Sequence, residues 1–428
     1  MPSRHEIVAV IKDPMYSQGI PLTTFEHRAL STYPMRRLEE IPVASNFRNS
    51  LSILPKNSGK RIAGSRRQHS IGAFYISTVA TELPETKKDF AVKAKFINAA
   101  NLFHDIGTFP FSHASEDQCT KLKGKTHEQM AGEIIHSHKH LRTLIANYLG
   151  NAALDLLPAL IEGQTSLEGQ SIPYSLLVNA KNLCFDPDGI DNGQRSLQER
   201  GLTSFKFYDQ LRLAQGYRMN DDGIYLELGG MHDINGLLQA RKILYDHINS
   251  PQNMSPQATG ARGLELAYRE NQLPDEFTFY TDAEATSFLE SKKMNSGTRV
   301  IFQRLARGDF YPRVAFYTVE KPDEVLREYM INPDSKYLLA DEISKMLKTD
   351  PENVAVQMGK DKGHRRIQIP IIIDGKITQF RYHVPETYSA QIYVYLHGNL
   401  RGRIDEVRQL VDDKFMRLTV VKNLARAA

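Results

Sequence analysis

Residues 101–113, which read Asn-Leu-Phe-His-Asp-Ile-Gly-Thr-Phe-Pro-Phe-Ser-His, decide which fold the chain is predicted to adopt. An apolar stretch predicts a helix over residues 93–103, and Gly107 and Pro110 then stop or bend it. Neighbouring helix residues point about 100° apart, so His104 and Asp105 can share one centre only where the helix end faces a cavity. Both side chains are good ligands for a divalent metal. Taken alone, such a pair is more often a buried His–Asp hydrogen bond.

Three further blocks accompany this stretch. Residues 66–72 read Arg-Arg-Gln-His-Ser-Ile-Gly, residues 126–128 read Thr-His-Glu, and residues 186–191 read Asp-Pro-Asp-Gly-Ile-Asp. In this order the four blocks resemble the HD-domain phosphohydrolases, specifically their dNTP triphosphohydrolase branch. The resemblance implies a mainly α fold, with a helical HD-domain core and a smaller mixed α/β C-terminal lobe. We place the HD domain at residues 1–250 and the second lobe, which resembles an oligomerising lobe, at residues 251–428.

The resemblance also implies a metal centre. Members of the family bind their metal with a His, a His–Asp pair and a distant Asp, and the matching residues are His69, His104, Asp105 and Asp188. Two imidazoles and two carboxylates suit Mn²⁺, Fe²⁺, Zn²⁺, Co²⁺ or Mg²⁺, and the sequence does not choose among these ions. Such a metal polarises a phosphoryl oxygen and lowers the pKa of a bound water.

Catalytic roles are implied for His113, Glu116 and His127. Glu116 lies three residues after His113, where the family has Asp, and on a helix this spacing puts both side chains on one face. The carboxylate can then orient the imidazole for general acid–base catalysis. The alternative is that the two histidines bind a second metal, and the proton-transfer interpretation is favoured.

The resemblance also implies a set of substrate-binding residues, for which the sequence offers less support than for the metal ligands. Arg66 holds the family position at which an arginine meets substrate phosphate. Arg37 opens an Arg-Leu-x-x-Ile block, and Arg241 and Tyr245 match a segment whose tyrosine helps to hold the sugar. Arg241 and Tyr245 are equally well interpreted as a surface arginine and a half-buried tyrosine on an ordinary amphipathic helix.

Three positions depart from the family pattern. Val43 stands at the position of a glutamine that contacts deoxyribose in the family, Asn192 replaces a tyrosine, and Thr108 replaces a second histidine after the His–Asp pair. Threonine cannot carry a proton near neutral pH as histidine does. These departures leave the base and sugar preference open, so a metal phosphohydrolase is predicted more firmly than a dNTPase.

Composition limits the class of protein. Of 428 residues, 41% are hydrophobic and 24% are charged, as in globular proteins, and the net charge of +4 permits anionic substrates without favouring general nucleic-acid binding. Two cysteines fit a reducing compartment, and no apolar run reaches the 18 residues of a membrane span. We therefore expect a cytoplasmic protein with no membrane partner.

The C-terminal pattern is mixed. Residues 314–319 predict a strand, and residues 367–373 and 376–384 flank Asp-Gly, a strong hairpin signal. We predict a loop at residues 249–261, a helix from Pro385 through Tyr395, and a last helix at residues 404–418.

Three functions follow from these patterns. The first is hydrolysis of (deoxy)nucleoside triphosphates to nucleoside and triphosphate by a homo-oligomeric enzyme, in control of a nucleotide pool or in antiviral defence. The second is an HD phosphodiesterase or nuclease acting on nucleic acid or a cyclic nucleotide, for which the basic stretch at residues 55–67 would provide phosphate contacts. The third is a nucleotide sensor that does not hydrolyse its ligand. A nucleotide activator, the oligomer size and the pathway stay open.

Overall fold

The computed structural model describes most of the chain. The described residues are 6–43, 47, 64–82, 88–172, 178, 186–220, 223–227, 231–320, 329, 332–360, 367–373, 376–382, 389–415 and 421–423. Most of the basic stretch at residues 55–67 and the Asp374–Gly375 turn lie outside them.

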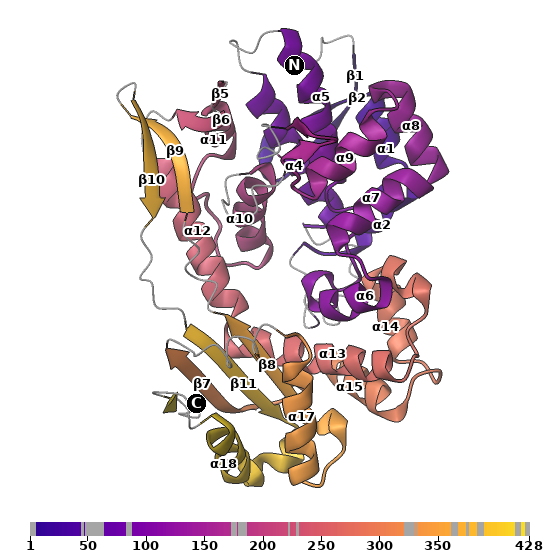
Figure 1. The fold of residues 1–428 in the computed structure, drawn as a ribbon, viewed down its shortest axis with the longest axis vertical. Helices are drawn as coiled ribbons and strands as arrows, with labels where there is room; N and C mark the ends of the chain where they lie inside the picture. Colours follow the sequence, from indigo (N-terminus) through magenta and orange to yellow (C-terminus); the bar gives the residue numbers. More distant parts are fainter. Residues whose placement is uncertain are drawn as a thin grey trace.

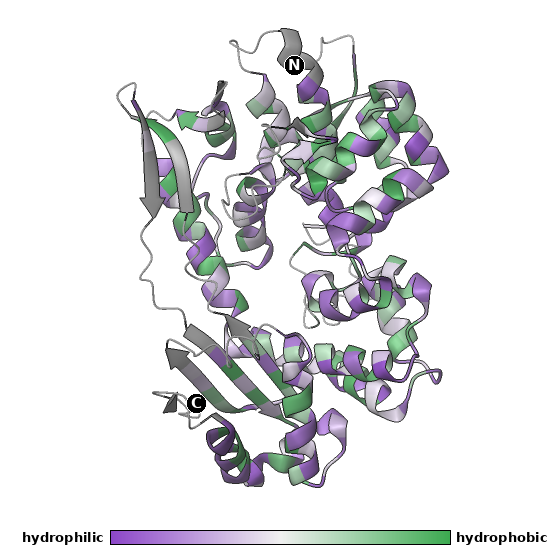
Figure 2. Ribbon diagram, in the orientation of Figure 1, coloured by the Kyte–Doolittle hydropathy of each residue, from purple (hydrophilic) through white to green (hydrophobic). Residues whose placement is uncertain are grey.

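The first part of the chain is helical and packs around one large apolar core (Figure 1). Its helices are α1 (Thr24–Leu30), α2 (Tyr33–Arg37), α4 (Arg66–Thr81), α5 (Lys88–Phe103), α6 (Glu116–Lys123), α7 (His127–Ser137), α8 (Lys139–Leu149), α9 (Ala153–Ile161), α10 (Pro187–Glu199), α11 (Gln210–Gln215) and α12 (His232–Ile248). Helix α4 packs against both α5 and α10, and α9 packs against α5 and α7. Figure 2 shows α9 as largely apolar, in keeping with its buried side chains.

Capping residues explain where the helices of the predicted site begin. Ser65 and Gln68 form a capping box at the start of α4, and Thr126 and Gln129 form another at the start of α7. Asp186 caps α10 by accepting a hydrogen bond from the backbone of Gly189. Each of these helices starts within a few residues of a histidine or aspartate of the predicted site.

A two-stranded ribbon precedes the helices. Strands β1 (Ile7–Asp13) and β2 (Tyr16–Thr23) pair antiparallel. Their inner side chains, such as Ile20 and Leu22, belong to the large helical core. The β1–β2 ribbon therefore packs on the same core as α4 and α10.

The later part of the chain is mixed α/β. Helices α13 (Pro251–Arg269), α14 (Asp282–Leu289), α15 (Ser296–Ala306), α17 (Ser335–Met346) and α18 (Ile404–Phe415) accompany a sheet of β7 (Arg313–Glu320), β8 (Val354–Lys360), β11 (Ser389–Leu396) and β12 (Val421–Asn423), in the order β12-β7-β11-β8. Figure 1 shows α17 and α18 beside this sheet, with which they form a second core. The predicted mainly α fold with a smaller mixed α/β part is confirmed.

A second sheet joins distant segments. The predicted hairpin is confirmed as β9 (Ile367–Ile373) and β10 (Lys376–Tyr382), and β9 pairs parallel with β6 (Gly223–Glu227), which is followed by β5 (Tyr217–Asn220) in the sheet order. A hairpin of the later part thus lies on the earlier part. The domain division at residue 250 stays a prediction.

Two predictions for the later part are wrong. The expected loop at residues 249–261 is mostly the start of α13, because Pro251 fits the first helical turn and Met254 and Ala258 bury an apolar face. The expected helix from Pro385 through Tyr395 is strand β11 over its described residues. Its aromatic and β-branched residues lie between β7 and β8, where a central strand packs on both sides.

No single helix of the described residues is long and apolar enough to cross a membrane. Helices α8 and α9 meet that measure of length and composition only together, across a bend of 106°.

Candidate metal centre and adjoining histidines

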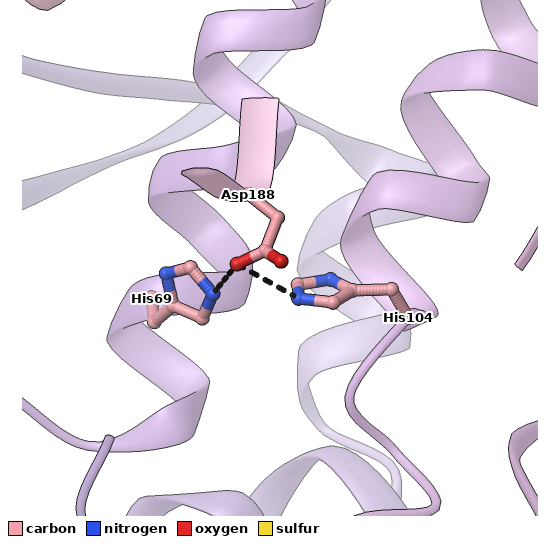
Figure 3. Close-up of side chains that lie close together, drawn as sticks. All are labelled: His69, His104 and Asp188. Atoms are coloured by element: carbon pink, nitrogen blue, oxygen red, sulfur yellow. Dashed lines mark hydrogen bonds and ion pairs between the residues drawn. The ribbon is translucent and has the colours of Figure 1, made fainter. Parts of the chain in front are cut away.

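Three helices bring three predicted ligands together (Figure 3). His69 projects from the first turn of α4, His104 follows the end of α5, and Asp188 lies in the first turn of α10. Their donor atoms lie within 4.8 Å of one another. Nε2 of His69 is 2.8 Å from Oδ1 of Asp188, and Nε2 of His104 is 4.0 Å from the same oxygen.

His104 presents a lone pair that nothing in the described part of the chain satisfies. Its Nδ1 donates to the backbone oxygen of Asn101 at 2.8 Å, so in the neutral ring the lone pair is on Nε2, which faces the cluster. That Nε2 is buried and has no hydrogen-bond partner among the described residues. Because a buried, unsatisfied acceptor is costly, its place beside a carboxylate and a second imidazole fits a bound cation.

His69 lies between two carboxylates. Its Nδ1 is 2.8 Å from Oδ2 of Asp191, on the side away from Asp188. Burial disfavours protonation of His69, but the hydrogen bonds to Asp188 and Asp191 outweigh it and raise the pKa to about 10. This position therefore attracts positive charge. A divalent ion would take the place of the proton on Nε2, while Asp191 holds the ring from behind.

Asp191 belongs to a buried network whose role the sequence did not reveal. Its carboxylate accepts hydrogen bonds from Tyr16 at 2.7 Å and from Arg195 at 2.7 and 3.0 Å, and Arg195 also reaches Asp13 at 3.1 Å. Burial opposes the ionised form of Asp191, but Arg195 and His69 lower its pKa. Gly72 makes room, because a Cβ there would collide with the Asp191 carboxylate. The Asp191–Arg195 spacing of one helical turn was the signal available in the sequence.

Asp105, the fourth predicted ligand, lies beside the other three. Its Oδ2 is 3.5 Å from Nε2 of His104 and 3.9 Å from Nε2 of His69. Arg66 donates to both of its oxygens, at 2.9 and 3.1 Å, and the Thr108 hydroxyl donates to Oδ1 at 3.1 Å. Arg66, predicted to meet substrate phosphate, is buried and holds Asp105. Burial opposes ionisation of Asp105, but Arg66 and the neighbouring histidines bring its pKa well below the usual range.

A second cluster consists of His113, Glu116 and His127. The two oxygens of Glu116 accept from Nδ1 of His113 at 3.0 Å and from Nδ1 of His127 at 2.8 Å. Nε2 of His113 is therefore left for other partners, whereas Nε2 of His127 lies 3.4 Å from Oε1 of Glu128. Burial raises the pKa of Glu116, but the two histidines overcome this and lower it. Burial lowers the pKa of His127, but Glu116, Glu128 and Asp105 together outweigh it and raise that pKa. His127 thus carries a proton more readily than a free histidine.

The turn between the two clusters is tightly built. Gly107 approaches the start of α7 so closely that a Cβ would collide with the backbone of His127 and Ala131. Phe111 and Ser112 adopt positive φ values of 61° and 53°, which side-chain-bearing residues rarely do. The backbone N–H of Phe111 donates to Asp282 of α14 at 2.7 Å. The later part of the chain therefore supports the strained turn that positions His113.

The other predicted substrate residues lie in different settings. Arg37 is buried and donates to the backbone oxygens of Ile106 at 3.1 Å, Thr108 at 2.6 Å and Tyr280 at 3.2 Å, so it braces the same turn. Arg241 and Tyr245 are half-buried on α12, which packs against α10. Their substrate contacts stay a prediction.

Two curated relatives match part of the chain, whereas no family model matches it. Over 202 residues it is 27% identical to a Dictyostelium discoideum protein named as the homologue of the deoxynucleoside triphosphate triphosphohydrolase SAMHD1, covering 43% of this chain and 37% of that protein. Over 226 residues it is 24% identical to the uncharacterized protein YwfO of Bacillus subtilis, covering 51% of this chain and 48% of that one. The chain thus spans less than half the length of either relative.

Two solved structures share the fold. A hypothetical protein from Aquifex aeolicus superposes with a TM-score of 0.67 at 15% identity, covering 94% of this chain and 99% of that one. A phosphohydrolase from Bacteroides thetaiotaomicron superposes with a TM-score of 0.64 at 18% identity, covering 91% and 99%. At these identities the likeness establishes the fold.

Proposed function

We infer that this chain is an HD-domain phosphohydrolase of the dNTPase-like group, and we propose that it hydrolyses (deoxy)nucleoside triphosphates to nucleoside and inorganic triphosphate. The order of its motifs, the relative named for that activity and the shared fold support the proposal. The observation that carries it is the buried, unpartnered Nε2 of His104, which faces Asp188 and His69. That arrangement suits a divalent ion.

The residues that would hold the ion are His69, His104, Asp105 and Asp188. When bound, a divalent ion supplies Lewis-acid polarisation of a phosphoryl oxygen and lowers the pKa of a coordinated water. The surrounding residues keep these donors in place. Asp191 orients His69, the Asn101 carbonyl orients His104, and Arg66 orients Asp105. The ion is not identified, and Mn²⁺, Mg²⁺, Fe²⁺, Co²⁺ and Zn²⁺ all remain candidates.

The cluster of His113, Glu116 and His127 would carry out the proton transfers of the reaction. Cleavage between the α-phosphorus and the 5′ oxygen takes one proton from water and gives one to the departing nucleoside. His127 is suited to be the donor, because Glu116 at its Nδ1 and Glu128, 3.4 Å from its Nε2, raise its pKa and favour the protonated ring. His113 shares the same carboxylate and would contact phosphate or accept the proton from water. His113 is largely exposed, at 68% of its side-chain surface, so substrate can reach it.

The proposal extends to partners and setting. The substrate is anionic, which the mild positive charge of the chain permits. We expect the enzyme to act as a homo-oligomer in the cytoplasm. A role in limiting nucleotide pools during antiviral defence follows if deoxynucleotides prove to be the substrates.

The first experiment is an assay of products. Purified protein is incubated with each dNTP and NTP in Mn²⁺ or Mg²⁺, and the mixture is separated by anion-exchange chromatography. We expect inorganic triphosphate and nucleoside, lost in His104→Ala and kept in His140→Ala, a control at an exposed histidine. If no nucleotide is consumed with either ion, the proposed reaction is wrong.

A specific observation favours a second candidate. Thr108 is bound to Asp105, and Asn192 accepts from Ser196 at 2.5 Å, so two substrate-side positions that depart from the family are occupied by internal contacts. An HD phosphodiesterase acting on nucleic acid or a cyclic nucleotide would need neither residue for sugar recognition. It would release a nucleoside monophosphate instead of triphosphate. A bound nucleotide that stays intact with metal present would instead indicate the non-hydrolysing sensor.

A further inference from the structure

The first strand of the chain has an open edge. β1 pairs with β2 along one side, and no strand of the described residues pairs with its other side. An open edge leaves backbone N–H and C=O groups that another strand can bind.

The outward face of this strand is apolar in the middle and charged at its ends. Exposure alternates, so that Val8, Val10 and Lys12 of β1 and Glu6, in the turn just before it, are exposed while Ala9 packs toward the core. Val8 and Val10 are 54% and 59% exposed, among the largest values for any large hydrophobic residue in the described part of the chain. On this face the side chains follow one another as Glu6, Val8, Val10 and Lys12, so two valines lie between a carboxylate and an ammonium group.

Two copies of this pattern match in charge only when the two strands run antiparallel. In an antiparallel pair centred on Ala9, Val8 faces the partner's Val10, and Glu6 faces the partner's Lys12. Two-fold symmetry repeats each contact, so two valine pairs and two opposite-charge pairs form on one face. A parallel pair in the same register would place each charge against its like.

We propose that a second copy of this chain docks on β1 by antiparallel pairing centred on Ala9. The two ribbons then form one four-stranded sheet across a two-fold axis, in the order β2-β1 followed by the partner's β1 and β2. The paired valines shield each other partly from water, and the open edge is removed. This surface is separate from the C-terminal lobe, where the sequence resemblance suggested oligomerisation. The inference does not depend on the proposed reaction.

The strand is also linked to the metal centre. β1 ends at Asp13, which binds Arg195 at 3.1 Å, and Arg195 in turn holds Asp191 at 2.7 Å. Pairing of β1 would therefore restrain Asp13, the first residue in the chain of contacts through Arg195 and Asp191 that holds His69.

The test is a charge reversal with rescue. Sedimentation velocity of the full chain over a range of concentrations measures self-association of the unaltered protein, Lys12→Glu, Glu6→Lys and the double variant. Each single reversal replaces two attractive pairs by two repulsive ones, so we expect about tenfold weaker association. The double variant restores opposite charges in the same register and should recover most of the affinity. Lys12→Arg, which keeps the charge, is the matched control.

A second measurement does not rely on affinity. In Val8→Cys/Val10→Cys each cysteine faces one of the partner's cysteines, so mild oxidation should yield a covalent dimer that a reductant dissolves. The unaltered chain, with Cys119 and Cys184, should yield none. The proposal is overturned if the chain is monomeric at every concentration. It is also overturned if an oligomer forms that neither single reversal weakens, or if the double variant fails to recover it.

Discussion

Removal of one hydroxyl tests how Asp105 of the proposed metal centre is held. Thr108 stands where the family that the sequence resembles has a second histidine, and its hydroxyl donates to Oδ1 of Asp105 at 3.1 Å. Arg66 donates to both oxygens of the same carboxylate. Together the two donors orient Asp105 so that Oδ2 faces His104 and His69. Thr108→Val keeps the shape of the side chain and deletes this hydrogen bond.

The expected cost follows from the burial of the carboxylate. A hydrogen bond to a charged group contributes about 1.5–3 kcal/mol, and Asp105 is 2% exposed, so water cannot replace the lost donor. Because Arg66 keeps its contacts with both oxygens, we expect the low end, about 1.5 kcal/mol. If all of it falls on metal binding, the dissociation constant rises about tenfold.

Two measurements separate the effects. Isothermal titration calorimetry with Mn²⁺ reports the metal affinity, and guanidinium unfolding without metal reports the stability of the chain. Thr108→Ser keeps the hydroxyl and should resemble the unaltered protein in both. If Thr108→Val and Thr108→Ser bind metal equally well, Thr108 does not position Asp105 and the reasoning fails.

Three further predictions concern the surroundings of the site. Glu116→Gln should lower the rate of hydrolysis by about 10²–10⁴-fold in steady-state assays, because His127, the proposed proton donor, loses its charged partner. Metal affinity should stay unchanged. A loss of metal affinity would place Glu116 in a metal site instead. Gly107→Ala should destabilise the chain by about 1–3 kcal/mol in chemical unfolding, since its Cβ meets the backbone of His127, whereas Gly398→Ala, in open space, should not. Burial raises the pKa of Glu199 to about 8, above its usual value of 4.5, so the folded state holds a proton that the unfolded state has lost. Stability should therefore fall as pH rises from about 4.5 to 8, by at most about 1.4 kcal/mol per pH unit, and Glu199→Gln should flatten that slope.

The sequence alone determined the helical class and the family resemblance, because both depend on local patterns. The apolar run before His104, the capping Thr126 and the Asp-Gly between two strands act over a few residues. The errors arose where packing outweighed local preference. Pro251 was taken as a loop signal but starts α13, and the segment after Pro385 forms a central strand because β7 and β8 lie on both sides of it.

Only the tertiary structure decided how the site residues are used. Arg66 and Arg37 matched substrate-binding positions, yet their guanidinium groups are buried against Asp105 and backbone oxygens. Asp191 and Asp13 lie 178 positions apart in number and meet through Arg195, a relation that no local pattern encodes. Hydrogen bonds and burial act through space, so the partner of a charged side chain is fixed only when α4, α10 and the ribbon pack together.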